Sequence, residues 1–178
     1  MGCLPARVPD ACPRIAASYR CLDLQSTHQP GKRNNMIRYT TECPDPAEYF
    51  SLFETTGWNG KYAATQDELA SAVRHSWLTV SALDGDHLVA SGRVVSDGVL
   101  YAMIYDMIVR PEYQRRGIGS ELLTRLVAQC RSAGIRDIQL FSAAGKVSFY
   151  ERHDFQRRPD EAPGMRIASA TPCVGRQR

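Results

Sequence analysis

One segment of the chain, residues 108–119, combines residue types and spacing that suit the binding of a phosphate group. It joins the end of an expected strand to the start of an expected helix, and its centre is Gln114-Arg115-Arg116-Gly117-Ile118-Gly119. The first amides of a helix have no acceptor within the helix, carry a partial positive charge, and are easily approached beside glycine. The segment therefore predicts an anion-binding loop.

Two common phosphate-binding motifs do not fit this segment. A dinucleotide-binding loop needs a third glycine where the chain has Leu122, and a P-loop needs Gly-Lys followed by Ser or Thr, which the sequence lacks. A tight strand-to-helix turn with basic flanks is the alternative without a ligand.

A second segment makes the interpretation of this loop more specific. Gln-x-x-Gly-x-Gly after a strand ending in Val109-Arg110-Pro111 resembles the pyrophosphate loop of the GNAT (GCN5-related N-acetyltransferase) superfamily. Residues 149–155, Phe-Tyr-Glu-Arg-His-Asp-Phe, resemble that family's Phe-Tyr-Glu-x-x-Gly-Phe segment, one strand and one short helix downstream. Over residues 36–168 the chain is identified as a small single-domain member. It departs from the family pattern at Asp154, where glycine is usual, and at Ala143, where many members have a cofactor-contacting Asn.

The resemblance implies both a fold and a cosubstrate. The fold is α+β (mixed α/β), with a mostly antiparallel twisted sheet of six to seven strands, about four helices, and a splayed strand pair that forms an acetyl-CoA cleft. Acetyl-CoA is the implied acyl donor, and no metal is expected. The residues implied in acetyl-CoA binding are Met107, Ile108, Val109, Gln114, Arg115, Arg116, Gly117, Ile118, Gly119, Ser120 and Tyr150.

Two residues are candidates for proton transfer. By resemblance, Tyr150 is the acid that protonates the departing thiolate; packing in the core is its alternative role. Asp106 is the candidate base, because producing a neutral amine at pH 7 costs roughly 4 to 5 kcal/mol and its apolar neighbours Ile104 and Ile108 suit a partly buried carboxylate. An Asp that orders water, binds the substrate ammonium or caps a bulge is the alternative.

Five aromatic residues and one asparagine are the candidates for the acceptor pocket. The resemblance places that pocket between the first two helices and the central strands, where aromatic walls would suit a small or arylalkyl amine. Core packing or a dimer interface is the alternative for each. The candidates are Tyr49, Trp58, Asn59, Tyr62, Tyr101 and Tyr105.

The elements that must position these residues follow from periodicity and capping. The pattern predicts a strand over 37–41, helices beginning at Asp45-Pro46 and at the Thr65-x-x-Glu68 capping box, and an aromatic loop between them. Asp-Gly turns separate three expected strands, 77–83, 87–96 and 99–109. A helix from Gly117 to Gly134, a strand over 136–142, a helix over 146–153 and the start of a last strand or hairpin over 155–158 complete the pattern.

Charge and composition bound the function. The whole chain has a formal charge of +3, yet residues 1–35 hold five Lys or Arg against two Asp or Glu, so residues 36–178 are neutral. A neutral domain argues against nucleic-acid binding. No apolar run is long enough to span a membrane, and the scattered cysteines predict reduced thiols in a cytoplasmic protein.

The chain divides into two expected regions. Residues 1–35 contain four prolines without a sustained pattern, which predicts a disordered extension, and Met36 is an alternative start. Residues 36–178 form the expected N-acetyltransferase domain. The expected activity is direct acetyl transfer to a primary amine in a ternary complex, on a small molecule, with a homodimer as a further possibility. A GNAT-fold module that binds acetyl-CoA as a sensor is the alternative.

Overall fold

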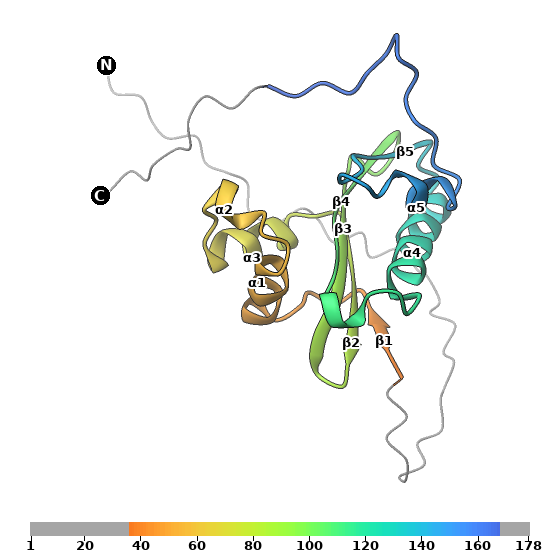
Figure 1. The fold of residues 1–178 in the computed structure, drawn as a ribbon. Coiled ribbons are helices and arrows are strands. Elements are labelled where there is room, and N and C mark those ends of the chain that lie inside the picture. The colour runs from red at the N-terminus through yellow and green to blue at the C-terminus, as the bar shows by residue number, and fades with distance from the viewer. Residues whose placement is uncertain (1–35, 168–178) are drawn as a thin grey trace, which may run out of the picture. The chain divides into compact units, whose positions relative to one another are not determined.

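The computed structural model describes residues 36–167, drawn in colour in Figure 1. Their centre is a sheet in the order β1-β2-β3-β4-β5, in which the first four strands are antiparallel and β5 runs parallel to β4. The strands are β1 (Arg38–Thr40), β2 (Leu78–Asp84), β3 (His87–Ser96), β4 (Tyr101–Val109) and β5 (Asp137–Leu140). The mixed α/β class with a mainly antiparallel sheet is confirmed, with five strands in the described part instead of six to seven.

Helices cover both faces of this sheet (Figure 1). On one side lie α1 (Pro46–Glu54), α2 (Asn59–Tyr62) and α3 (Gln66–Arg74); on the other lie α4 (Ile118–Ser132) and α5 (Val147–Glu151). A 3-10 turn, η1 (Pro111–Tyr113), follows β4. The expected number of helices, about four, omitted α2, because a single helical turn is too short to show periodicity in the sequence.

Local capping explains where the first helices begin. Asp45 Oδ1 accepts the backbone N–H groups of Ala47 (2.9 Å) and Glu48 (3.1 Å), and Pro46 follows it. Thr65 and Glu68 form the reciprocal capping box at the start of α3. Both starts agree with the prediction, because these contacts involve only residues close in sequence.

Two expected strand positions were wrong. Asp97 Oδ1 accepts the N–H groups of Val99, Leu100 and Tyr101, so β4 starts at Tyr101 and not at position 99. The strand expected over 155–158 is absent: Phe155 N–H donates to Tyr150 O, and its ring packs 6.1 Å from that of Tyr150. The Asp97 side chain in the first case, and contacts with the end of α5 in the second, replace the expected strand pairing.

Each face of the sheet has its own core. On one face, small and branched residues of the strands pack against Leu122, Leu123 and Leu126 of α4. These three leucines are fully buried. Against α1 and α3 pack Leu88 and Ile108. The two cores fix both helical layers to the same strands, so β4 carries residues of both.

The predicted disordered extension, residues 1–35, lies outside the described residues, as do residues 168–178 of the predicted domain. In the described part of the chain, no helix has the length and apolar character needed to cross a bilayer.

Candidate active site

The parallel strands β4 and β5 separate at the point where the sequence predicted cofactor contacts. Pairing between β4 and β5 runs from Tyr101↔Asp137 to Ile104↔Leu140, where β5 ends, while β4 continues to Val109. Within residues 36–167, the backbone of 105–109 therefore has no strand partner on that edge. An extended ligand with amide groups can pair with such an edge as an added strand.

A β-bulge lies at the start of this open edge. Ser91 pairs with Ile108 and Arg93 pairs with Tyr105, so Asp106 and Met107 together oppose Gly92. Asp106 has φ +51°, in the left-handed region that Asp tolerates better than most residues. A bulge re-aims the backbone of a strand, and here it does so beside the splayed edge.

The Asp106 carboxylate is bound from two neighbouring elements. Its Oδ2 accepts Arg93 Nε–H from β3 at 2.5 Å and the hydroxyl of Tyr49 from α1 at 3.3 Å. The side chains of Arg93 and Asp106 are 18% and 17% exposed. Arg93 Nη1 also donates to Ser76 Oγ at 3.3 Å. Asp106 thus belongs to an ion-paired network, which the sequence did not reveal.

The network changes the titration of its other members. Burial, followed by the negative charge of Asp106, raises the pKa of the Tyr49 phenol far above its ordinary value. Burial alone would lower the pKa of Arg93, but the Asp106 carboxylate raises it overall. Tyr49 therefore stays protonated and Arg93 stays charged at neutral pH. No donor is found for Asp106 Oδ1 among the described residues, so the base role remains a prediction.

Variants of Asp106 should separate the base role from the bulge role. If the bulge conformation matters, Asp106→Gly and Asp106→Asn should keep more activity than Asp106→Ala, since alanine pays roughly 1 to 2 kcal/mol in the left-handed region. If Asp106 is the base, all three should be slow at neutral pH and recover as pH rises. The rate of acetyl transfer, measured from pH 6 to about 9.5, distinguishes the two roles. This range lies below the amine pKa of ~10.4. All three remove the negative charge that pairs with Arg93, so their comparison cancels the loss of the ion pair.

The loop after β4 has the geometry of an anion site. Arg115 and Gly117 take positive φ values of 61° and 80°, and Gly117 is the N-cap of α4 without a side-chain cap. The first backbone hydrogen bond of α4 runs from Glu121 N–H to Gly117 O. The N–H groups of positions 118–120 therefore have no acceptor within the helix. Gln114 Nε2 donates to Val109 O at 3.0 Å, which fastens the loop to the end of β4.

Gly117 and Gly119 differ in what glycine contributes to the loop. The positive φ of Gly117 favours glycine for its backbone conformation. A Cβ added at Gly119 would lie 3.4 Å from Val109 Cγ2 and 3.8 Å from Phe149 Cζ, which are ordinary contacts. Since protein packing does not demand glycine at 119, the missing side chain leaves the helix start open to a ligand.

The second motif packs against this helix start. His153 Nε2 lies 3.1 Å from Ser120 Oγ, and the Phe149 ring packs on His153 and on Tyr150. Asp154, the departure from the motif glycine, has φ +66°, in the left-handed region that glycine adopts freely and Asp tolerates. The contact of His153 with Ser120 spans 33 residues, so the sequence alone does not reveal it.

Tyr150, the residue predicted to donate a proton, lies among aromatic side chains. It lies on α5, partly buried against the core, with its ring at 5.0 Å from Phe149 and 6.1 Å from Phe155. Burial raises the pKa of its phenol, so the hydroxyl holds its proton at neutral pH. The other departure, Ala143, lies exposed in the turn after β5.

The structure divides the six candidates for the acceptor pocket. Tyr49 and Tyr105 contact the Arg93–Asp106 pair, through the Tyr49 hydroxyl and through the Tyr105 ring, whose centroid lies 5.5 Å from the Arg93 guanidinium. Trp58 packs edge-on against Phe53, and the Asn59 side-chain amide donates hydrogen bonds to Glu54 Oε1 and Ala64 O. Both residues therefore hold α2 in place. The other two, Tyr62 and Tyr101, are exposed.

Comparison with known proteins decides the family. The model of the acetyltransferase (GNAT) family matches residues 40–155. The chain belongs to the GNAT family. This confirms the identification made from the two motifs.

Several relatives of this GNAT protein are named N-acetyltransferases. An uncharacterised N-acetyltransferase, ycf52, of Porphyra purpurea is 30% identical, with 66% of this chain and 68% of the relative covered. Serotonin N-acetyltransferase 2 of rice, Oryza sativa subsp. japonica, is 36% identical, with 56% of this chain and 52% of the rice protein covered. The match therefore spans about half of the rice protein. GCN5-related N-acetyltransferase 1 of Arabidopsis thaliana is 31% identical, with coverages of 90% and 79%.

Solved structures agree with the GNAT fold. A GNAT-family acetyltransferase from Streptococcus pneumoniae is 28% identical with a TM-score of 0.62, over 76% of this chain and 100% of that one. PaiA N-acetyltransferase from Thermoplasma acidophilum, solved with coenzyme A, is 16% identical with a TM-score of 0.57, over 69% and 91%. The second likeness shows the fold alone.

Proposed function

We propose that this GNAT protein transfers the acetyl group of acetyl-CoA directly to the primary amine of a small molecule, within a ternary complex. The observation that carries the proposal is the continuity of the open β4 edge with the glycine turn of α4. The edge offers backbone N–H and C=O groups to the amide-containing arm of acetyl-CoA. The turn offers N–H groups that have no partner in the helix to the phosphates of acetyl-CoA. The names of the relatives support the same reaction class.

The residues of the cleft fit acetyl-CoA. The backbone of Met107, Ile108 and Val109 would pair with the amide-bearing arm, and residues 114–120 would hold the pyrophosphate. Gly119 supports this assignment, because the surrounding protein would accept a Cβ there at ordinary contact distances, so packing alone does not explain the glycine. When bound, acetyl-CoA supplies an activated thioester.

Tyr150 and Asp106 would handle the protons of the reaction. Tyr150 keeps its proton at neutral pH, so its hydroxyl can donate to the leaving thiolate. Asp106, through Oδ1, would receive a proton from the acceptor ammonium directly or through water, while Arg93 and Tyr49 hold Oδ2. This division keeps the carboxylate oriented while one oxygen stays available.

We propose a small aromatic or alkyl amine as the acceptor. The position of Tyr105 beside the Arg93–Asp106 pair supports an aromatic wall next to the proton acceptor. The rice relative is named for serotonin, an arylalkylamine, whereas a soybean relative is named a histone acetyltransferase. A protein lysine is therefore the competing acceptor in the test. We also propose a cytoplasmic location, which cell fractionation would test; the rice and Arabidopsis relatives carry the word chloroplastic in their names.

Acetyl-CoA should stabilise the protein and release free thiol only with the right amine. A ligand that binds only the folded state adds about 2.7 kcal/mol at a hundredfold excess over its Kd, so a thermal-shift titration should show a clear rise in Tm. A panel of aryl-alkylamines, alkylamines and lysine peptides, followed by thiol detection, should identify the acceptor. A Tm rise without thiol release from any amine would favour the sensor module, and no Tm rise would remove both functions.

A further inference from the structure

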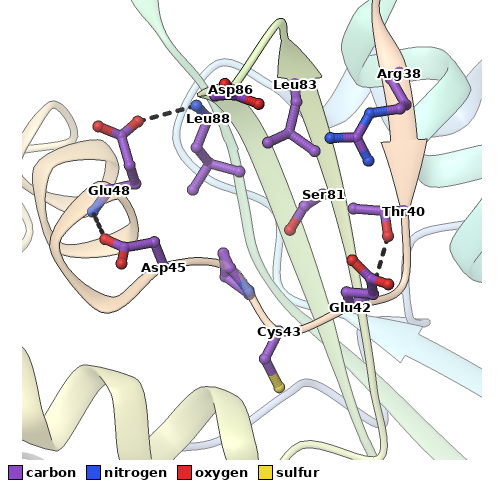
Figure 2. A pocket seen from close by; sticks show the side chains of 11 residues that line it. Arg38, Thr40, Glu42, Cys43, Asp45, Glu48, Ser81, Leu83, Asp86 and Leu88 are labelled. Atoms are coloured by element: carbon purple, nitrogen blue, oxygen red, sulfur yellow. Dashed lines mark hydrogen bonds between the residues drawn. The ribbon is translucent and has the colours of Figure 1, made fainter.

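A pocket with a volume of about 110 Å³ lies away from the acetyl-CoA cleft, beside the loop that joins β1 to α1. Figure 2 shows side chains from β1, β2, α1 and the β2–β3 turn around it. Strands β2 and β3 separate β1 from β4, so this pocket and the open edge of β4 lie on different parts of the sheet. The proposed acetyl transfer assigns no role to these residues.

Ser81 gives the pocket an unsatisfied polar group. Its side chain is fully buried, and Oγ has no hydrogen-bond partner within residues 36–167. In Figure 2 this oxygen points toward the pocket. The paired Ser91 is equally buried, but its Oγ donates to Val80 O at 3.4 Å. Buried hydroxyls in native proteins generally find a partner in protein, water or ligand, so Ser81 points to a bound group in the pocket.

The charges around the pocket favour a cation. Four carboxylates line it, from Glu42, Asp45, Glu48 and Asp86, against one guanidinium, from Arg38. Asp45 is engaged as the helix cap, and Glu48 accepts Leu88 N–H at 3.0 Å and lies 2.9 Å from His87 Nδ1. The carboxylates of Glu42 and Asp86 have no protein partner in the described part of the chain. Two acidic groups are thus available to a positively charged ligand.

The chemistry of the lining selects an ammonium group over a metal ion. The described residues contain no group of three or more His, Cys, Asp or Glu side chains placed to hold a metal. An ammonium group has three N–H donors, which match carboxylate and hydroxyl acceptors. A pocket of about 110 Å³ has room for more than a single water molecule. The space suits a short alkyl chain carrying one ammonium group.

We propose that this pocket is a second ligand site, which binds a short primary alkylammonium ion through Glu42, Asp86 and Ser81. Cys43 lines the same pocket and is exposed, so its thiol is a local reporter of occupancy. Cys130 is the internal reference: it is buried, and desolvation raises the pKa of its thiol to about 11, which keeps it unreactive at neutral pH.

The test measures alkylation of Cys43 by iodoacetamide, through peptide mass spectrometry, with propylammonium chloride and without acetyl-CoA. At about ten times the Kd, the site is roughly 90% filled by mass action, so the Cys43 rate should fall about tenfold. Propan-1-ol, a neutral molecule of matched size, should leave the rate unchanged. Absence of protection by propylammonium, or equal protection by propan-1-ol, would overturn the proposal.

Variants locate the effect in the pocket. Asp86→Asn and Glu42→Gln should remove the protection, whereas Glu121→Gln, which deletes a charge on α4, should keep it. Ser81→Ala should weaken protection without lowering Tm, because the hydroxyl has no protein partner to lose. Protection that survives in the Asp86→Asn, Glu42→Gln double variant would refute the site, as would a clear loss of Tm in Ser81→Ala. Acetyl transfer is not measured, so the outcome is independent of the proposed function.

Discussion

Replacing Tyr150 by Phe should lower kcat for acetyl transfer by about 10²-fold, near the lower end of the range for general acids. The thiol of the leaving group has a pKa near ~8.5, so its thiolate leaves without full protonation, and the acid contributes less than it would for a poorer leaving group. The ring contacts with Phe149 and Phe155 are kept in the variant, so the fold and the affinity for acetyl-CoA should change little. Steady-state kcat and KM, with a thermal-shift titration of acetyl-CoA, measure both effects.

Tyr39→Phe is the matched control for this prediction. Tyr39 lies on β1, where its ring packs under Arg125 of α4, away from the cleft, so the same loss of a hydroxyl should leave kcat unchanged. If Tyr150→Phe kept the wild-type kcat with a raised KM, Tyr150 would only position acetyl-CoA. The proton would then come from water or from the ammonium product.

Replacing Gly119 by Val should remove the stabilisation of the protein by acetyl-CoA. That stabilisation is about 2.7 kcal/mol at a hundredfold excess over Kd, and a branched side chain at the start of α4 would occupy the place of the pyrophosphate. Without ligand the variant should still fold, because a Cβ at this position meets Val109 and Phe149 at ordinary contact distances. Thermal shift at increasing acetyl-CoA measures the loss.

Two further variants make this result interpretable. Gly119→Ala adds only a Cβ, at ordinary contact distance from Val109 and Phe149, so it should fold as well as the wild type and bind acetyl-CoA more weakly. Gly60→Val, on α2, has no neighbouring atom within 4 Å of the added Cβ, and it should keep the full shift. A full acetyl-CoA shift in a folded Gly119→Val protein would mean that the phosphates do not bind at the start of α4.

Local sequence signals located the parts of the fold that depend on neighbouring residues. Asp45 and Thr65 predicted the starts of α1 and α3, because a cap bonds amides two or three residues away. The same locality explains the two errors. The Asp97 side chain takes three amides that the alternating pattern had assigned to a strand, and the end of α5 holds Phe155.

The sequence by itself determined the family, the class of fold and the position of the glycine turn before α4. Gln114, Gly117 and Gly119 stand at fixed spacing between a strand and a helix, and this spacing is a property of the chain alone. Only the tertiary structure brought Arg93 to Asp106, Tyr49 to the same carboxylate, and His153 to Ser120. These partners are separated by 13, 57 and 33 residues, and they meet because strand register and helix packing place them together. The orphan hydroxyl of Ser81 is likewise invisible in sequence, since burial and the absence of a partner are properties of the packed sheet.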